Sequence, residues 1–377
     1  MAVYIESVGM TKFGSRKEGL SELFLEAAIR AISLIPDNKR DFDALFVGAM
    51  NPAEISGEDN IGAMMADYLG LLPIPAFRVE NAPASGSAAL HQAYFAVTSG
   101  IYEKVLVLAG EKMTDKNSKE LAGIFAKLAP EYERKYGITV PALTAMLTRR
   151  YMHDFGLTRE DLALIPVKSH EIAKKNPNAH FHKEISVDDV LSSPVISDPL
   201  RLYDCAPISD GACAAVLTSN QGEVEIVGLG HGADTLYYQH RDVFSSFPAT
   251  TQAASAAYSM AGIEPKEIDV LETHDAFSIL ELVNCEDLGL FERGRCINAI
   301  KEGITKLGGD LPVNPSGGLK AKGHPVGATG LAQVCELFWQ LTDDAGSRKV
   351  NSPEIGLTHN IGGFGNNAAV TILKKAD

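Results

Sequence analysis

A weak internal repeat is the feature of this 377-residue sequence that most restricts its fold. The strand-like run Val3–Val8 returns as Val224–Leu229, and the strand around Asp43 returns around Asp269. The two pairs are separated by 221 and 226 residues, so nearly the same offset relates both. Self-similarity of this kind predicts that a complete α/β unit was duplicated, and therefore that the chain has two similar halves.

Strand-like and helix-like segments alternate within each half. In the first, apolar runs such as Phe42–Gly48 alternate with segments of 3.6-residue periodicity such as Leu20–Leu34. This alternation predicts a mostly parallel sheet covered by helices. We place the N-terminal half at residues 1–221 and the C-terminal half at residues 222–377, with a turn at Gly230–Gly232. Ligands of such sheets bind beyond strand ends and at helix N-termini, so we expect a site where loops of both halves meet.

The pattern changes between about residues 115 and 207. Charged amphipathic segments dominate there, and we expect them to form a helical insertion, or lid, carried by the N-terminal half. The expected helices are Lys116–Glu133, Thr144–Phe155 and Arg159–Asn176.

Composition excludes several classes of protein. The formal net charge is −14 and no Lys/Arg-rich run is present, which argues against a nucleic-acid-binding protein. No apolar run reaches the roughly 20 residues of a membrane-spanning helix, and the N-terminus enters a strand pattern without a signal peptide. The five cysteines lack the spacing of a zinc site or a disulfide framework, so we expect reduced thiols and a cytoplasmic protein.

Residues 314–330 form a glycine-rich stretch around one histidine, His324, and an apolar helical pattern follows directly. Glycines at this density indicate backbone that adopts positive φ or lets another group approach closely. The Gly318–Gly323 spacing is similar to that of a phosphate-binding loop, but His324 and Pro325 follow where that motif needs lysine and serine or threonine. An ATPase or GTPase is therefore excluded.

Three histidines follow predicted strands in the C-terminal half: His274, His324 and His359. Histidine suits proton transfer near neutral pH, so together these positions predict an acid–base site. Each histidine alone is also compatible with a structural role. A three-histidine metal site is disfavoured, because no pair has the i, i+4 spacing of helical ligands and no carboxylates cluster beside them.

Several motifs together resemble the thiolase superfamily, in particular its archaeal and sterol-carrier-type branch of acetyl-CoA acetyltransferase-like proteins, over almost the whole chain. The matching segments are Arg78–Glu80, Ala84–Ser87, Asp198–Leu202, Pro207–Gly211, His274–Phe277, Leu288–Phe291, Asn314–Gly330 and Gly362–Gly365. The resemblance implies an α/β fold, a five-layer αβαβα sandwich of two duplicated halves, that acts on coenzyme A thioesters without a metal or a covalently bound cofactor. It also implies a homodimer or tetramer and, in this branch, a small zinc-ribbon/OB-fold partner subunit that helps to hold coenzyme A.

One position departs from that family pattern. Where the family has its nucleophilic cysteine, this chain has Pro83. Proline has neither a thiol nor a backbone N–H, so it cannot carry an acyl group or donate a hydrogen bond to the thioester oxyanion. Loss of one such donor typically costs roughly 3 kcal/mol of transition-state stabilisation. Thiolysis that depends on a cysteine is therefore disfavoured.

The resemblance assigns site roles to the remaining residues by position. His274 and His324 occupy the positions that polarise the thioester carbonyl and stabilise its enolate, and Asn360 stands in place of the second family cysteine. The expected site further contains His359 as a catalytic residue, backbone groups of Gly362 and Gly363 at the oxyanion, and Ser85, Gly86, Ser316 and Gly317 as substrate contacts.

What the chain retains is the enolate-stabilising part of a thiolase site. This favours C–C bond chemistry at the α-carbon of an acyl-CoA without a covalent acyl-enzyme, as in retro-aldol cleavage. Two alternatives stay open. One is a conventional acetyl-CoA acetyltransferase or 3-ketoacyl-CoA thiolase, which the overall resemblance favours, and the other is a non-catalytic subunit that binds acyl-CoA or scaffolds a partner.

Overall fold

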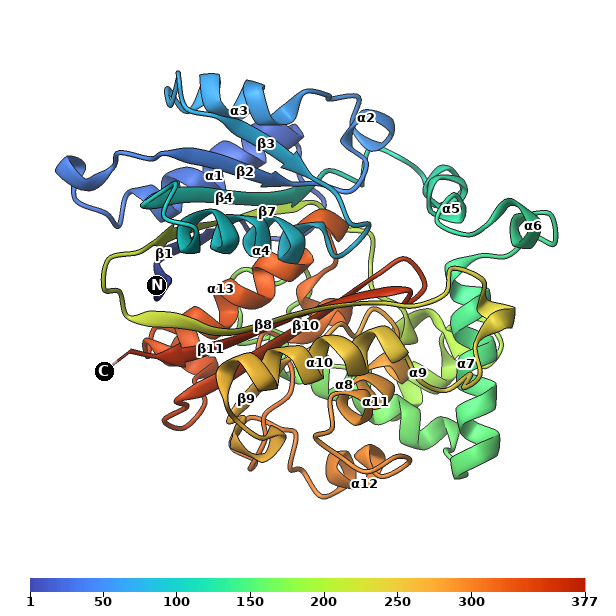
Figure 1. The fold of residues 1–377 in the computed structure, drawn as a ribbon. Helices are drawn as coiled ribbons and strands as arrows, with labels where there is room; N and C mark the ends of the chain where they lie inside the picture. Colours follow the sequence, from blue (N-terminus) through green and yellow to red (C-terminus); the bar gives the residue numbers. More distant parts are fainter. Residues whose placement is uncertain (377) are drawn as a thin grey trace.

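Nine strands form the centre of the computed structural model, which describes residues 1–376, in the order β3-β2-β4-β7-β1-β8-β11-β10-β9 (Figure 1). The N-terminal half contributes β1 (Tyr4–Met10), β2 (Ala44–Gly48), β3 (Ala76–Val79), β4 (Lys104–Glu111) and β7 (Gly211–Thr218). The C-terminal half contributes β8 (Val224–Ala233), β9 (Val270–Glu272), β10 (Ile355–Gly362) and β11 (Asn367–Lys375). The two sets of strands are joined where β1 pairs with β8, and this pairing involves two residue pairs. Because the connection is so short, each half has a sheet of its own, and the two sheets are linked at one edge.

Strand pairing repeats from one half to the other. β2 pairs in parallel with β3 and β4, and β7 pairs antiparallel with β4 and β1. Likewise, β9 pairs in parallel with β10, β11 pairs antiparallel with β10 and β8, and a parallel bridge between Leu271 and Val313 takes the place of β3. The predicted duplication is confirmed. The sheets are mixed rather than mostly parallel, because a short turn joins β10 to β11 and such a connection permits only antiparallel pairing.

Helices form the other three layers (Figure 1). α1 and α3 cover the outer face of the first sheet, α4 and α13 lie side by side between the sheets, and α10, with α11 beside it, covers the second sheet. This arrangement confirms the predicted five-layer sandwich. Within residues 1–376, no helix is both long and apolar enough to cross a membrane. The helices are α1 (Leu20–Ile32), α2 (Pro52–Ile55), α3 (Ile61–Tyr68), α4 (Ser85–Thr98), α10 (Pro248–Ala261), α11 (Ser278–Asp287), α12 (Cys296–Lys301) and α13 (Thr329–Leu341).

Glycines let α10 lie directly on a strand. The predicted turn at Gly230–Gly232 is wrong, because β8 continues through these residues. A Cβ atom at Gly230 would lie 1.7 Å from the backbone oxygen of Ala253 in α10, and one at Gly232 would lie 2.0 Å from that of Ala249. The glycines therefore make room for close approach of the helix rather than for a change in chain direction.

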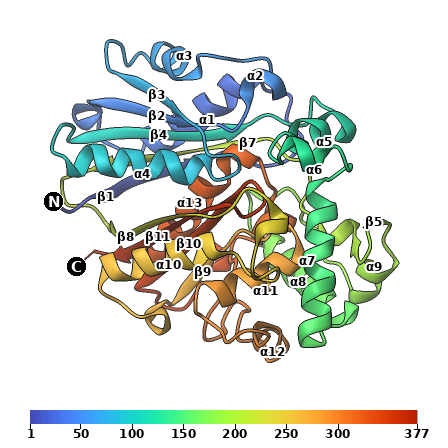
Figure 2. The same cartoon turned by 45° about the vertical axis from the view of Figure 1, so that its right-hand side comes forward.

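The segment between β4 and β7 is helical, as predicted, but it packs against both halves (Figure 2). Pro130 divides the expected helix Lys116–Glu133 into α5 and α6, because the residue before a proline avoids helical geometry. α8 contacts α11 and α12, and Lys168 of α8 forms a buried ion pair with Glu281 of α11, with 2.5 Å between Nζ and Oε1. The elements of this insertion are α5 (Ser118–Ala126), α6 (Glu131–Arg134), α7 (Val140–Phe155), α8 (Arg159–Ala173), α9 (Val187–Ser192), β5 (Val195–Ser197) and β6 (Leu200–Arg201).

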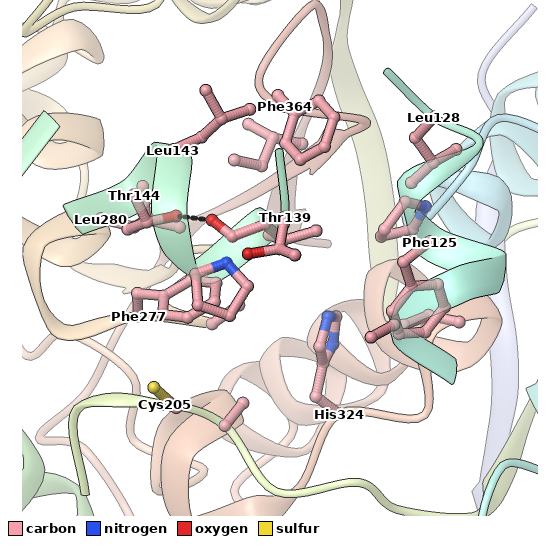
Figure 3. Close-up of a pocket in the computed structure, with 18 of the residues that line it drawn as sticks. Phe125, Leu128, Thr139, Leu143, Thr144, Cys205, Phe277, Leu280, His324 and Phe364 are labelled. Atoms are coloured by element: carbon pink, nitrogen blue, oxygen red, sulfur yellow. Dashed lines mark hydrogen bonds between the residues drawn. The ribbon is translucent and has the colours of Figure 1, made fainter. Parts of the chain in front are cut away.

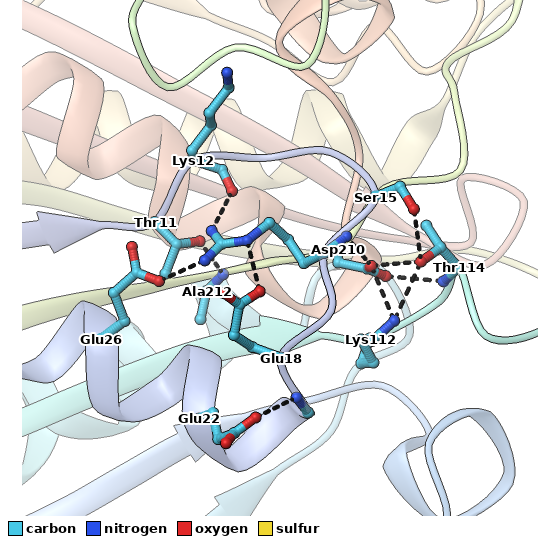
Figure 4. Close-up of polar contacts among 12 residues, drawn as sticks. Thr11, Lys12, Ser15, Glu18, Glu22, Glu26, Lys112, Thr114, Asp210 and Ala212 are labelled. Carbon is cyan, nitrogen blue, oxygen red and sulfur yellow. Dashed lines mark hydrogen bonds and ion pairs between the residues drawn. The ribbon is translucent and has the colours of Figure 1, made fainter.

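The buried carboxylate of Asp210 ties the two ends of the insertion together (Figure 4). It lies directly before β7 and accepts hydrogen bonds from the N–H groups of Met113 and Thr114, just after β4, at 2.6 and 2.8 Å. It also accepts from the N–H of Arg16 at 2.9 Å and from Nζ of Lys112 at 3.1 Å. One side chain therefore fixes where the insertion leaves the sheet and where it returns.

Candidate active site

A cavity of about 280 Å³ lies between the two halves and the insertion (Figure 3). Pro83, His274, His324 and Gly363 line it, so the structure brings together four predicted site residues from both halves. Pro83 precedes α4, His274 follows β9, His324 precedes α13 and Gly363 follows β10. All four lie at strand ends or before helices, where the repeat predicted a ligand site.

His324 is held in one tautomer by Thr329. Its Nδ1 atom lies 2.7 Å from Oγ1 of Thr329, and that hydroxyl donates its single hydrogen to the carbonyl of Pro325 at 3.1 Å. Because the hydroxyl hydrogen is already used, Nδ1 of His324 is the donor in this contact. The neutral ring therefore has its lone pair on Nε2, which is the state of a hydrogen-bond acceptor or base.

His274 has the opposite tautomer, which is determined by a series of hydrogen bonds through two side-chain amides. The series begins at the carbonyl oxygen of His359, which can only accept, so Nε2 of Gln333 donates to it at 3.0 Å. Oε1 of Gln333 therefore faces Nδ2 of Asn360, at 3.4 Å, and that same nitrogen donates to Nδ1 of His274 at 3.2 Å. Since Nδ1 of His274 accepts, Nε2 carries the hydrogen.

The two imidazoles lie edge to face, with ring centroids 5.0 Å apart and an interplanar angle of 88°. Burial, together with the charge of Lys322, lowers the pKa of His324 to about 3. Burial also lowers the pKa of His274 well below its ordinary value of 6.5, helped by the neighbouring His324. Both rings are therefore neutral near pH 7. One presents a hydrogen-bond donor to the cavity and the other an acceptor.

Two buried lysines lie close enough to the histidines for their charges to lower the pKa values of both rings. Lys320 and Lys322 are 2% and 0% exposed, and they pair with Asp275 at 3.5 Å and with Glu272 at 3.6 Å. Burial raises the pKa of Glu272 to about 7, against the opposing charge of Lys322. Sequence reasoning missed this network, because lysine is normally exposed. The available signal was the position of both lysines between a glycine turn and His324.

Pro83 lies in a tight loop ahead of α4, two residues before the first helical residue. Ala82 in this loop has a φ of +50°, which is unfavourable for a residue with a Cβ atom. Oγ of Ser85 donates to the carbonyl of Ala82 at 2.6 Å and accepts from the N–H of Asn81 at 2.9 Å. A Cβ atom at Gly362 would lie 2.6 Å from the carbonyl oxygen of Asn81. Ser85 and Gly362 therefore shape this loop, and neither lines the cavity, where contacts with the substrate and its oxyanion were predicted.

Three other predicted substrate contacts also lie outside the cavity lining. A Cβ atom at Gly86 would be 2.8 Å from the carbonyl oxygen of Gly327, so this glycine lets α4 and α13 pack closely. Ser316 donates to both carboxylate oxygens of Glu272, each at 2.9 Å, and Gly317 packs against α8. These three residues therefore stabilise the glycine-rich segment 314–330 without lining the cavity.

His359, for which the resemblance predicts a catalytic role, does not line the cavity. It lies inside β10 rather than in a loop, and it alternates with Asn360, so their side chains point to opposite faces of the sheet. Its Nδ1 lies 3.0 Å from Oγ1 of Thr273 and its Nε2 lies 3.0 Å from Oγ1 of Thr250, so both ring nitrogens have partners. Across residues 1–376, no three His, Cys, Asp or Glu side chains are grouped as a metal site.

Cys205 lines the cavity, although sequence reasoning gave it no role. Its thiol donates to the carbonyl of Arg201 at 3.5 Å. Burial, helped by the negative charge of Asp204, raises the pKa of Cys205 to about 12. Because the thiolate is the reactive form, Cys205 does not replace the missing nucleophile. The available signal was its place beside the Pro207–Gly211 motif.

This duplicated fold, with two histidines of the C-terminal half packed edge to face in a cavity that both halves line, defines a thiolase-like protein. Comparison with known families agrees. Residues 3–221 match the family "Thiolase, N-terminal domain", and residues 230–375 match "Thiolase C-terminal domain-like". The chain belongs to the thiolase family.

Individual relatives cover almost the whole chain. It is 42% identical over 381 residues to an acetyl-CoA acetyltransferase of Methanothermobacter thermautotrophicus, with 99% of each chain covered. It is 34% identical to sterol carrier protein 2 of Homo sapiens, covering 99% of this chain and 72% of that one. Among solved structures, it is similar to an Ltp2-ChsH2(DUF35) aldolase, with a TM-score of 0.83, 25% identity and coverage of 99% and 98%.

Proposed function

We propose that this protein catalyses retro-aldol cleavage at the α-carbon of a β-hydroxyacyl-CoA, without forming an acyl-enzyme. The observation that carries the proposal is Pro83 in the cavity wall beside two neutral histidines, one a donor and one an acceptor. Pro83 has no nucleophilic atom, and Cys205 keeps its proton. Similarity to a solved structure named an aldolase supports this chemistry.

In the proposed reaction, Nε2 of His324 accepts the proton of the β-hydroxyl group. The O–H electron pair forms the C=O bond of an aldehyde or ketone, and the Cα–Cβ bond breaks. Its electron pair moves into the thioester, giving an enolate whose oxygen accepts a hydrogen bond from Nε2–H of His274. The proton on His324 then passes to the α-carbon, so the products are a shorter acyl-CoA and a carbonyl compound. Negative charge on the enolate favours the protonated form of His324 during the reaction.

Acetyl transfer is the second candidate, because the relative at 42% identity is named an acetyl-CoA acetyltransferase. That reaction needs a nucleophile that carries the acetyl group between two substrates. The cavity offers a proline at the expected position and a thiol whose pKa is about 12. If neither reaction is detected, the remaining interpretation is that the protein is a non-catalytic subunit that binds acyl-CoA.

We also infer that the chain works in an assembly, as a homodimer or tetramer with a small zinc-ribbon/OB-fold subunit. The name of the similar aldolase structure joins two components, which supports a second subunit. Such a subunit would help to hold coenzyme A, while the residues of this chain act on the acyl group.

Mass spectrometry of the intact protein tests the absence of covalent chemistry. After incubation with acetyl-CoA, the mass of the wild-type protein is expected to stay unchanged, whereas a 3-hydroxyacyl-CoA is expected to yield a shorter acyl-CoA and a carbonyl compound. Pro83→Cys restores a thiol and a backbone N–H together, so this variant is expected to gain an acetyl adduct at position 83. A stoichiometric acetyl adduct on the wild-type protein would contradict the proposal and favour acetyl transfer.

The rate of cleavage is expected to depend little on pH in mild acid. Because burial lowers the pKa of His324 to about 3, the base keeps its lone pair as the pH falls. We expect kcat/KM to stay level from about pH 8 to about pH 5, a range over which an ordinary histidine becomes protonated. Circular dichroism at each pH checks that the protein remains folded. An acid limb with its midpoint near 6.5 would show that His324 titrates normally and would contradict this prediction.

A further inference from the structure

The side-chain amide of Asn360 is the hydrogen-bond partner of His274 at Nδ1, with 3.2 Å between Nδ1 and Nδ2 of Asn360. An asparagine amide has an NH2 group, which donates, and an oxygen, which accepts. A neutral imidazole nitrogen accepts from the first with its lone pair and donates to the second with its hydrogen. The orientation of the Asn360 amide therefore decides which nitrogen of His274 has the hydrogen.

The oxygen of Asn360 does not fix this orientation. Oδ1 of Asn360 is buried and has no hydrogen-bond partner among residues 1–376. If the amide turned over, its NH2 group would occupy the same unpartnered position. Either orientation therefore leaves one buried polar group unpaired, at a similar cost in free energy. The orientation must be selected by a contact on the other side of the amide.

That contact is made by Gln333 of α13, whose side chain is 0% exposed and does not line the cavity. Its Nε2 donates to the backbone carbonyl of His359 at 3.0 Å, and its Oε1 lies 3.4 Å from Nδ2 of Asn360. Because a carbonyl cannot become a donor, the amide of Gln333 is held with its oxygen toward Asn360. A reversed Asn360 amide would place two oxygens against each other.

We propose that Gln333 is a positioning residue for the reaction: it keeps the amide of Asn360 in the orientation that leaves the hydrogen of His274 on Nε2. Its effect on the rate rests on the proposed function, in which that hydrogen is donated to the enolate oxygen. In the reversed tautomer, both His274 and His324 present lone pairs to the cavity, and the negative charge of the enolate has no imidazole donor. Gln333 therefore acts on the enolate through two intervening side chains, without touching the substrate.

Nitrogen NMR of the full-length protein measures the tautomer directly and needs no substrate. In protein labelled with nitrogen-15 histidine, a ring nitrogen with a hydrogen and one with a lone pair differ widely in chemical shift, and the spectrum of His274→Ala identifies the signals of His274. We expect the hydrogen on Nε2 in the wild type. Gln333→Met removes both polar atoms but keeps the length of the side chain. We expect it to shift the tautomer ratio toward Nδ1–H by ~10-fold or more, because a hydrogen bond and an oxygen–oxygen repulsion that oppose the reversed amide are both lost.

Cleavage kinetics measure the consequence of the reversed tautomer. The kcat of Gln333→Met is expected to fall by ~10- to 100-fold, somewhat less than when an oxyanion donor is removed entirely. The Kd for butyryl-CoA, which lacks a β-hydroxyl and is not cleaved, is expected to change by less than ~3-fold, since the enolate charge develops only in the transition state.

Gln333→Glu is the conservative variant. At about pH 5 a buried carboxyl group remains protonated, so it donates to the carbonyl of His359 and accepts from Asn360 as the glutamine does. We expect the wild-type tautomer and a kcat within ~3-fold of the wild type at that pH. This variant keeps the test valid if methionine disturbs the fold, since a reversed tautomer in Gln333→Glu would contradict the proposal.

Gln340→Met is the matched control. Gln340 lies on the same helix and is 0% exposed, and its Nε2 donates to Oε1 of Glu336 at 2.9 Å and to the carbonyl of Arg348 at 3.1 Å. The substitution therefore removes buried amide hydrogen bonds from α13 without removing one to Asn360. We expect a loss of stability comparable to that of Gln333→Met, with the histidine tautomer and the kcat of the wild type.

The outcomes separate this role from the proposed function. A hydrogen on Nδ1 of His274 in the wild type, or an unchanged tautomer ratio in Gln333→Met, would overturn the role of Gln333. A reversed tautomer with a wild-type kcat would also overturn it, because the donor would then not affect the rate. A reversed tautomer with slower cleavage, absent from Gln340→Met, would support it. A reversed tautomer in a protein whose wild type cleaves no 3-hydroxyacyl-CoA would leave the control of the tautomer standing and overturn the retro-aldol function instead.

Discussion

His324→Ala is expected to lower kcat for C–C cleavage by about 10²- to 10⁴-fold, the usual contribution of a positioned general base. The Kd for a non-cleavable acyl-CoA is expected to change by less than ~3-fold, because the proton transfer belongs to the transition state and not to the bound substrate. Steady-state kinetics and calorimetry on the same preparation separate the two quantities. Thermal unfolding of the variant checks that removal of this half-buried ring leaves the fold intact.

A second histidine provides the control for this result. His182→Ala removes an exposed histidine that does not line the cavity, so its turnover is expected to match that of the wild type. If His324→Ala also turns over at the wild-type rate, the ring is structural and the assignment of the base is wrong. An equal loss in kcat and in acyl-CoA affinity would instead place His324 in binding.

Asp210→Ala is expected to lower the free energy of unfolding by about 3–5 kcal/mol, the range found when one partner of a buried charged pair is removed. The carboxylate accepts hydrogen bonds from two N–H groups after β4, from the Arg16 N–H and from Lys112, which is itself 2% exposed (Figure 4). Its loss leaves those donors buried without their acceptor. Urea denaturation followed by circular dichroism measures the change.

Asp115→Ala is the matched control for that variant, because Asp115 pairs with the same Lys112 at 2.6 Å but its side chain is 64% exposed. Asp115→Ala is expected to lower the free energy of unfolding by less than ~1 kcal/mol. Although burial opposes the charge of Asp210, hydrogen bonds from Thr114 and the Arg16 N–H lower its pKa below 3.8. Its stabilisation is therefore complete above that pH and is lost as the pH falls through the lowered pKa. The difference in free energy of unfolding between the wild type and Asp210→Ala should therefore shrink in acid. A difference below ~1 kcal/mol at neutral pH would contradict the prediction.

Local patterns were sufficient for most elements of the fold. The repeated strand and helix patterns indicated a duplicated α/β unit, and strand pairing confirms it. Two expectations failed for different reasons. Gly230–Gly232 has the composition of a turn, but its glycines make room for α10 inside β8. The parallel sheet expected from alternating elements is mixed, because β7 and β11 run against their neighbours.

The candidate site was harder to predict than the fold. His274, His324, Pro83 and Gly363 were found from their motifs, and the structure places them on one cavity. His359 has an equally suggestive motif, yet it lies on the other face of β10 with both nitrogens satisfied by threonines. Alternation along a strand separates neighbouring side chains, and the position of the strand boundary decides whether a residue is in a loop or in the sheet.

By itself, the sequence determined the duplicated architecture and the chemical inventory of the site, including the absence of a thiol and an N–H at Pro83. These properties depend on residue identity and on short-range periodicity, both of which can be read along the chain. Only the tertiary structure decided the opposite tautomers of His274 and His324, the burial of Lys320 and Lys322, and the raised pKa of Cys205. Tautomers, burial and pKa values depend on partners from distant segments, which become neighbours only when both halves and the insertion pack together.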